Sequence, residues 1–133
     1  EHRNSRPPLR FQGAMQAWRV PKAARPFVGA AWMTAIDLVI DPLAAGPLGY
    51  WRWIEGGASF GIPASNFAGW FVVSLLIFAL LPSRWQPGRP LVWLGASVVA
   101  FFALLALLLG FPLPGALGLL LLVLGLCSHR LKS

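Results

Sequence analysis

Residues 91–109 read LVWLGASVVAFFALLALLL, a run of nineteen residues without a charged side chain. A helix of this length extends roughly 28 Å at about 1.5 Å per residue, close to the ~30 Å thickness of a bilayer hydrocarbon core. Its four spaced alanines, Ala96, Ala100, Ala103 and Ala106, are small enough to let a second helix approach closely. The stretch therefore predicts a membrane-spanning helix that packs against neighbours.

The composition of the whole chain points the same way. Of its 133 residues, 57% are hydrophobic and only 11% are charged, whereas about a quarter of the residues in a soluble domain are charged. The single cysteine, Cys127, excludes an intrachain disulfide, and both histidines, His2 and His129, lie near the ends, so we expect no metal site. The chain also lacks the His-Glu-x-x-His motif, and histidines only at its two ends argue against a soluble hydrolase or metalloenzyme.

Prolines and polar loops separate three further apolar segments, residues 26–41, 66–81 and 116–127. We expect the first to end before Pro42, because proline disfavours helix at the preceding residue, and the second to begin with Asn66 as its N-cap. The sequence thus predicts an all-α fold, a polytopic membrane helix bundle with about four transmembrane segments. Residues 42–65, rich in Gly, Pro and aromatic side chains, predict an irregular loop between the first two.

Charge divides the chain into a basic segment at residues 1–25, the transmembrane bundle at 26–128 and a basic tail at 129–133. The first segment fits either an interfacial amphipathic helix or a solvated tail. If the chain starts in the cytoplasm and all four segments cross, ten of the eleven Lys and Arg residues are cytoplasmic, as the positive-inside rule favours. We therefore expect a multi-pass protein of the cell (inner) membrane with both ends of the chain cytoplasmic.

This placement accounts for the net charge of +7 without a nucleic-acid partner. A protein that binds single-stranded nucleic acid needs aromatic side chains interleaved with many cations. Here only Trp51 and Trp53 flank an arginine, Arg52, and the other tryptophans lie apart from dense positive charge. We expect no nucleic-acid partner.

Three of the four acidic residues, Asp37, Asp41 and Glu55, lie in or just after the first apolar segment. Asp37 and Asp41 are four residues apart, so in a helix that reaches Asp41 they share a face, together with Met33. Ionisable groups inside a membrane segment are costly and mark functional sites by default. Two neighbouring carboxyls in a low dielectric do not easily both ionise, so one can hold a proton and act as a general acid.

Each candidate also has a structural interpretation. Asp41 can close a turn before Pro42, and Asp37 can hydrogen-bond to a neighbouring helix. Glu55 can pair with Arg52 on the surface, where an ion pair contributes little. The tryptophans are typical of interfacial anchors.

Two stretches resemble the carotenoid biosynthesis protein family, MTAIDLVIDPLA at residues 33–44 and GYWRWIEGGASFGIPASNFAGWF at residues 49–71. They contain Asp-x-x-x-Asp-Pro, Trp-x-Trp, aromatic-Gly-Ile-Pro and Asn-Phe-x-Gly-Trp in the family's order, with Phe60 where a tyrosine is expected. The resemblance covers about residues 29–82. Family members are longer, so the chain resembles a C-terminal half.

The resemblance implies a carotenoid hydratase, which adds water across the terminal double bond of a linear carotenoid end group without a cofactor. It implies four catalytic candidates, Asp37 or Asp41 as the acid and Glu55 or Asn66 to position water. It implies four aromatic substrate-binding residues that stabilise a carbocation, Trp51, Trp53, Phe60 and Trp70. The implied partners are the carotenoid, membrane lipid, and either other carotenoid-pathway enzymes or the missing N-terminal half.

Two other functions stay open. A proton-coupled transporter also uses paired carboxyls within the membrane, although the chain shows no inverted internal repeat of the kind many carriers have. A non-catalytic membrane partner that binds lipid or carotenoid would tolerate loss of both aspartates but not of the aromatic residues.

Overall fold

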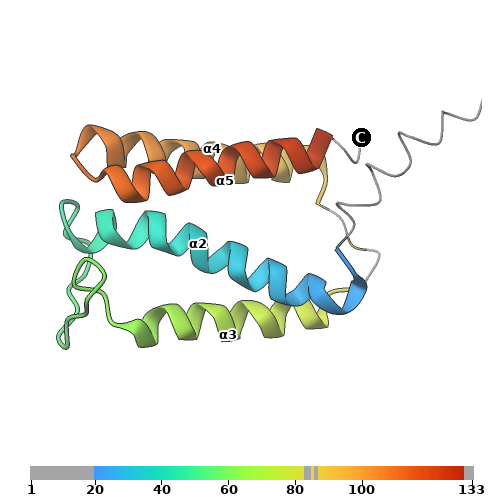
Figure 1. Ribbon diagram of the computed structural model, residues 1–133, viewed down its shortest axis with the longest axis horizontal. Coiled ribbons are helices and arrows are strands. Elements are labelled where there is room, and N and C mark those ends of the chain that lie inside the picture. Colours follow the sequence, from blue (N-terminus) through green and yellow to red (C-terminus); the bar gives the residue numbers. More distant parts are fainter. Residues whose placement is uncertain (1–19, 83–84, 86, 131–133) are drawn as a thin grey trace, which may run out of the picture.

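A computed structural model describes residues 20–82, 85 and 87–130, and its regular structure is helical. The elements in chain order are η1 (Lys22–Ala24), α2 (Arg25–Ala45), α3 (Ala64–Leu80), α4 (Arg89–Leu108) and α5 (Pro112–Arg130). Each α-helix runs antiparallel to the one before it in the chain (Figure 1). Within the described residues the only β-type pairing is an isolated bridge between Ser59 and Ile62. The predicted all-α class is confirmed.

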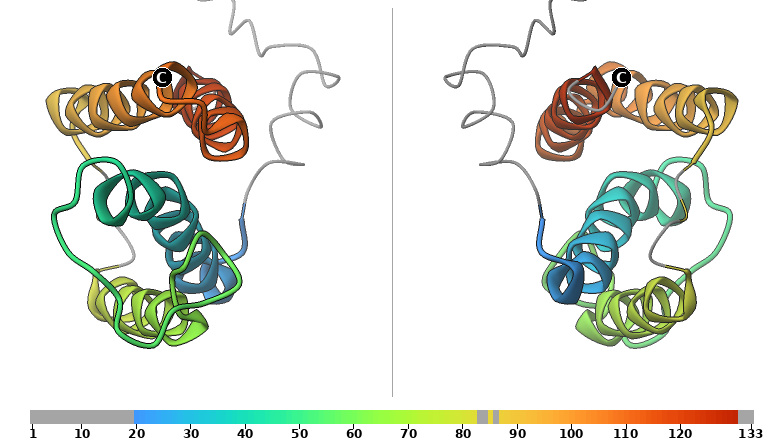
Figure 2. Two further views of the ribbon diagram at one scale, coloured as in Figure 1. Left: turned by 90° about the vertical axis from the view of Figure 1, so that its left-hand side faces the viewer. Right: turned by 90° about the vertical axis from the view of Figure 1, so that its right-hand side faces the viewer.

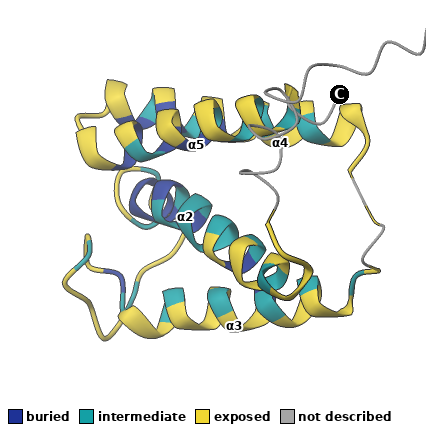
Figure 3. Cartoon of the chain, turned by 45° about the vertical axis from the view of Figure 1, so that its right-hand side comes forward, coloured by how far each residue is buried: buried dark blue, intermediate teal, exposed yellow. Residues whose placement is uncertain are grey.

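Helix α2 occupies the centre of the bundle. It packs against all three other α-helices, whereas α3 packs only against α2 and η1 packs only against α2 among the described elements. Figures 1 and 2 show α4 and α5 paired on one side of α2 and α3 on the other. Burial follows this arrangement, since the fully covered positions gather along α2 (Figure 3).

The core lies where α2 meets the pair of α4 and α5. Val39, Val99 and Leu121 form its buried cluster. Small residues bring the backbones together, because a Cβ on Gly118 would lie 2.6 Å from the Cβ of Ala103. Such small-residue contacts are the usual basis of close helix packing in membranes.

Three helical segments are long and apolar enough to cross a membrane: η1 with α2 (Lys22–Ala45), α4 and α5. Helix α3 is also apolar but has 17 residues, about 26 Å at 1.5 Å per residue. The chain is therefore a helical membrane protein. The predicted span at residues 91–109 agrees closely with α4, Arg89–Leu108.

Predicted boundaries of three helices were wrong. Helix α2 does not end before Pro42 but continues through it to Ala45. Pro42 removes only the hydrogen bond to the Leu38 carbonyl, and the last turn closes with the amide of Gly46 donating to the Pro42 carbonyl at 3.2 Å. The helix ends instead at Ala45, with Gly46 as its C-cap just before Pro47.

Asn66 is not the N-cap of α3, because Pro63 occupies that position and α3 begins at Ala64. The last helix is also longer than expected. It begins at Pro112 and reaches Arg130, because prolines are tolerated in a first turn whose amides have no intrahelical partner. Of the predicted basic segment, residues 1–19 lie outside the described part of the chain.

Candidate functional site

The polar centre of the bundle is a pair of carboxyl groups on α2. Helix α2 extends past Asp41, so Asp37 and Asp41 lie one turn apart on the same face. Both are buried, with 7% and 3% of their surfaces exposed. Buried acids require hydrogen-bond partners because an unpaired buried charge is very costly.

Asn66 supplies that partner from the first turn of α3. Its Nδ2 donates to Asp37 Oδ2 at 2.9 Å and to Asp41 Oδ2 at 2.6 Å. A side-chain amide has two N–H donors and one carbonyl acceptor, so both donors are engaged and Oδ1 is left as an acceptor. The residue therefore joins α2 to α3 through both acids, in place of the helix-capping role that its position in the sequence suggested.

A cavity of about 510 Å³ lies beside this triad, between α2, α3 and the loop that connects them. Besides the triad, the helices contribute Met33, Ile36 and Ile40 from α2 and Trp70 from α3. The loop contributes Trp51, Arg52 and Trp53. Three indole rings and three aliphatic or thioether side chains thus surround one polar cluster. Ligand sites commonly combine such an apolar lining with a few convergent polar groups.

The structure brings together most of the residues singled out from the sequence. Asp37, Asp41, Asn66, Trp51, Trp53 and Trp70 all line this cavity. Helical spacing explains why Trp70 joins Asn66, since the two residues are one turn apart on α3.

Glu55 and Phe60 do not line the cavity. Glu55 is exposed, and in the described part of the chain it forms no ion pair with Arg52. Phe60 has a positive φ of 53° in the loop and packs against Phe111, with ring centroids 5.9 Å apart. Its ring therefore ties the loop to the start of α5.

Three lining residues were not identified from the sequence: Ile36, Ile40 and Arg52. Ile36 and Ile40 flank Asp37 on α2, so a wider definition of the helical face that carries Asp37, Asp41 and Met33 would have included them. For Arg52, the sequence equally allowed an exposed ion pair with Glu55, so it did not indicate a place in the cavity.

Close backbone packing shapes the loop over the cavity. A Cβ on Gly57 would collide with the main-chain carbonyl of Ile62, and Ile62 is only 1% exposed. Only glycine fits this contact.

Further along the lining, Trp53 Nε1 is buried and has no hydrogen-bond partner among the described residues. A bound group that accepts a hydrogen bond would satisfy it.

The described residues include no group of three or more His, Cys, Asp or Glu side chains that could hold a metal ion. The polar and aromatic groups that the cavity offers are its two carboxyls, the amide of Asn66, the guanidinium of Arg52 and three indole rings. This set can exchange protons and can stabilise a positive charge through aromatic faces.

The chain matches a known protein family. A family model described as "Carotenoid biosynthesis protein" matches residues 9–125, which include every residue of the cavity. No curated protein and no solved structure matched the chain.

Proposed function

The chain belongs to the carotenoid biosynthesis protein family, and we propose that its cavity hydrates the terminal carbon–carbon double bond of a linear carotenoid. The observation that carries the proposal is the pair of buried acids, bridged by Asn66, at the wall of an aromatic-lined cavity between membrane helices. An apolar lining suits a hydrocarbon end group, and the two acids line the same cavity.

The proposed reaction begins with proton transfer from one carboxyl to the less substituted carbon of the double bond. The carbon–carbon π bond breaks, a carbon–hydrogen bond forms, and a tertiary carbocation is left on the other carbon. Because two neighbouring buried carboxyls do not easily both ionise, one member of the pair is suited to hold the proton that this step uses.

The indoles of Trp51, Trp53 and Trp70 are placed to stabilise the cation. A cation over an aromatic face gains roughly 2 kcal/mol or more when the site is desolvated. None of these rings readily forms a covalent bond to the cation, so it stays available to water. The aromatic lining thus offers stabilisation without a competing nucleophile.

Water then adds to the cation, forming a carbon–oxygen bond, and releases a proton to the carboxylate produced in the first step. The acid pair ends in its starting protonation state. Addition of water to a double bond involves no net oxidation or reduction, so the cycle needs neither an oxidant nor a reductant. Asn66 Oδ1 can accept a hydrogen bond from this water, and the indole N–H of Trp53 can donate one to it.

The test is expression of the chain in cells that make lycopene-type carotenoids. Chromatography with mass detection should find products heavier by one water, or by two if both ends react. We expect Asp37→Asn and Asp41→Asn each to lower product at least 100-fold at equal membrane levels, since general acid–base catalysis contributes about 10²–10⁴-fold.

Ser97→Ala serves as the control, because Ser97 is exposed and bonds only the carbonyl of Leu94 in its own helix. Full activity in both aspartate variants would refute the proposal. Carotenoid binding without any hydrated product would instead favour a non-catalytic carotenoid-binding partner. Proton movement that requires a membrane gradient but no carotenoid would favour a transporter.

A further inference from the structure

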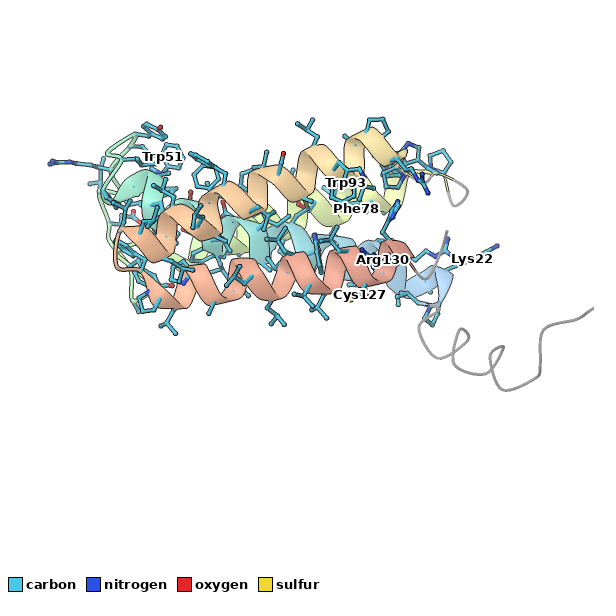
Figure 4. All side chains as sticks on the ribbon, turned by 90° about the horizontal axis from the view of Figure 1, so that it is seen from above. Lys22, Trp51, Phe78, Trp93, Cys127 and Arg130 are labelled. Atoms are coloured by element: carbon cyan, nitrogen blue, oxygen red, sulfur yellow. The ribbon has the colours of Figure 1, made fainter. Side chains whose placement is uncertain are left out.

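A second cavity lies at the opposite end of the bundle from the acid pair. It has a volume of about 220 Å³ and is formed by the start of α2, the end of α3 and the segment after α3. Lys22 and Arg25 contribute its cations, and Phe78, Leu81 and Trp85 contribute apolar surface. Figure 4 shows Lys22 and Phe78 toward this end and Trp51 at the other.

Positive charge dominates this end of the molecule. Besides Lys22 and Arg25, it carries Arg89 at the start of α4 and Arg130 at the end of α5. None of the described residues that line the cavity is acidic. All the acids in the described part of the chain, Asp37, Asp41 and Glu55, lie toward or in the loop at the other end.

The positive charge of Lys22 and Arg25 is not used up by the partial negative charge at the C-terminus of α3. A helix terminus carries about half an elementary charge, negative at the C-terminus and positive at the N-terminus. The C-terminus of α3 and the N-terminus of η1 and α2 both border this cavity, and neither η1 nor α2 has a side-chain cap at its start. The two half-charges cancel, and Lys22 and Arg25 are the formal charges among the described lining residues.

We propose that this cavity binds the phosphate group of an anionic membrane phospholipid. The cations would hold the phosphate, while Phe78, Leu81 and Trp85 offer apolar and aromatic contact to the part of the lipid that enters the hydrocarbon. Basic pockets at the ends of membrane helices are suited to such headgroups. A soluble phosphate would use the cations but would gain nothing from the apolar side of the lining.

The same end carries four of the five Lys and Arg residues in the described part of the chain, which favours the cytoplasmic face under the positive-inside rule. The cytoplasmic leaflet supplies anionic headgroups at that depth. The site is independent of the hydration chemistry, because it lies at the other end of α2 and shares no lining residue with the first cavity.

The experiment is native mass spectrometry of the purified chain titrated with phosphatidylglycerol, and with phosphatidylcholine as the neutral-headgroup reference. The double variant Lys22→Gln/Arg25→Gln should weaken phosphatidylglycerol binding about 30-fold, because each basic residue beside an anionic headgroup contributes about fivefold. Arg89→Gln/Arg130→Gln is the matched control, since it removes the same charge from the same end outside the cavity. It should change binding less than about threefold.

Equal losses in the two double variants would show a diffuse charge effect and overturn the site. Inorganic phosphate that displaces phosphatidylglycerol at similar concentration would assign the cavity to soluble phosphate and overturn the lipid proposal. If the double variant fails to fold, as judged by circular dichroism, Lys22→Gln replaces it. Lys22 is exposed, and its loss should cost about fivefold; unchanged binding in that variant would also count against the site.

Discussion

The hydrogen bonds of Asn66 should be a measurable part of the stability of the bundle. Asn66→Leu keeps the approximate size of the side chain and removes both donors to Asp37 and Asp41, which lie 2.9 and 2.6 Å away. The two acids are nearly fully buried. They would then face an apolar side chain, with no replacement donor supplied by the substituted residue.

The magnitude follows from weighing two estimates. Hydrogen bonds to charged groups contribute about 1.5–3 kcal/mol each in soluble proteins. In membranes the measured coupling for one interhelical hydrogen bond averages only ~0.6 kcal/mol and reaches ~1.7, because chains unfolded in the membrane also find partners. We give the membrane value more weight, and two bonds to one amide then predict a loss of about 1–3 kcal/mol in the free energy of unfolding.

The assay measures unfolding in mixed micelles as a denaturing detergent is added, with tryptophan fluorescence as the signal. A double-mutant cycle separates the bonds from other effects of the leucine. In the background Asp37→Leu/Asp41→Leu, the substitution Asn66→Leu should cost less than about 0.5 kcal/mol, because no acid remains to lose a donor. Ser97→Ala, which lies on α4 and bonds only within its own helix, should stay within about 0.5 kcal/mol of the parent.

An equal cost of Asn66→Leu in the presence and absence of the two aspartates would refute this reasoning. The stability of α3 against α2 would then come from apolar packing alone, and the amide would have no special part in joining the helices.

Three further substitutions test other features. Gly118→Ala should lower the free energy of unfolding by about 0.5–2 kcal/mol, since overpacking at the 2.6 Å contact outweighs the gain in helix propensity. The control is Gly95→Ala, which has open space around it and should be neutral or stabilise by up to about 1 kcal/mol in the same micelle assay. Equal effects of the two substitutions would contradict the packing at Gly118. Gly57→Ala should abolish most of the hydrated product while the helix content measured by circular dichroism stays normal, because its Cβ would displace the backbone at Ile62; normal turnover would show that the loop adapts. Glu55→Gln should retain product in the carotenoid assay, because Glu55 is exposed and outside the cavity, and a large loss would place it back among the candidate catalytic residues.

Much of the fold follows from local sequence. Long apolar runs and their prolines locate the helices, and the four-residue spacing of Asp37 and Asp41 predicts that they share a face of α2. The helix end predicted at Pro42 was wrong, because a proline in the last turn removes only one hydrogen bond and the residues after it pack in the core. Local pattern gives no weight to that tertiary packing, which leaves Leu43 and Ala44 fully buried.

The site depends on how α2 and α3 cross, which the sequence does not determine. Near the first turns of α2 the two helices are very close, since a Cβ on Gly29 would lie 2.7 Å from the ring of Phe78. At the loop end Asn66 reaches two acids that are 29 and 25 residues away in the sequence. Asn66 has a residue type typical of N-caps, so its interhelical role could be recognised only once the crossing was known.

The first cavity lies at the loop end of the bundle, away from the end where Lys22 and Arg25 lie. This position has a consequence for the order of products. Under the proposed reaction, a carotenoid that spans the bilayer presents one terminus to that leaflet and keeps the other in the opposite leaflet. Reaction at both termini requires the singly hydrated molecule to leave, carry its new hydroxyl across the hydrocarbon core, and return inverted. Moving an unpaired hydroxyl through hydrocarbon is costly, so the mono-alcohol should accumulate first and the diol should follow after a lag.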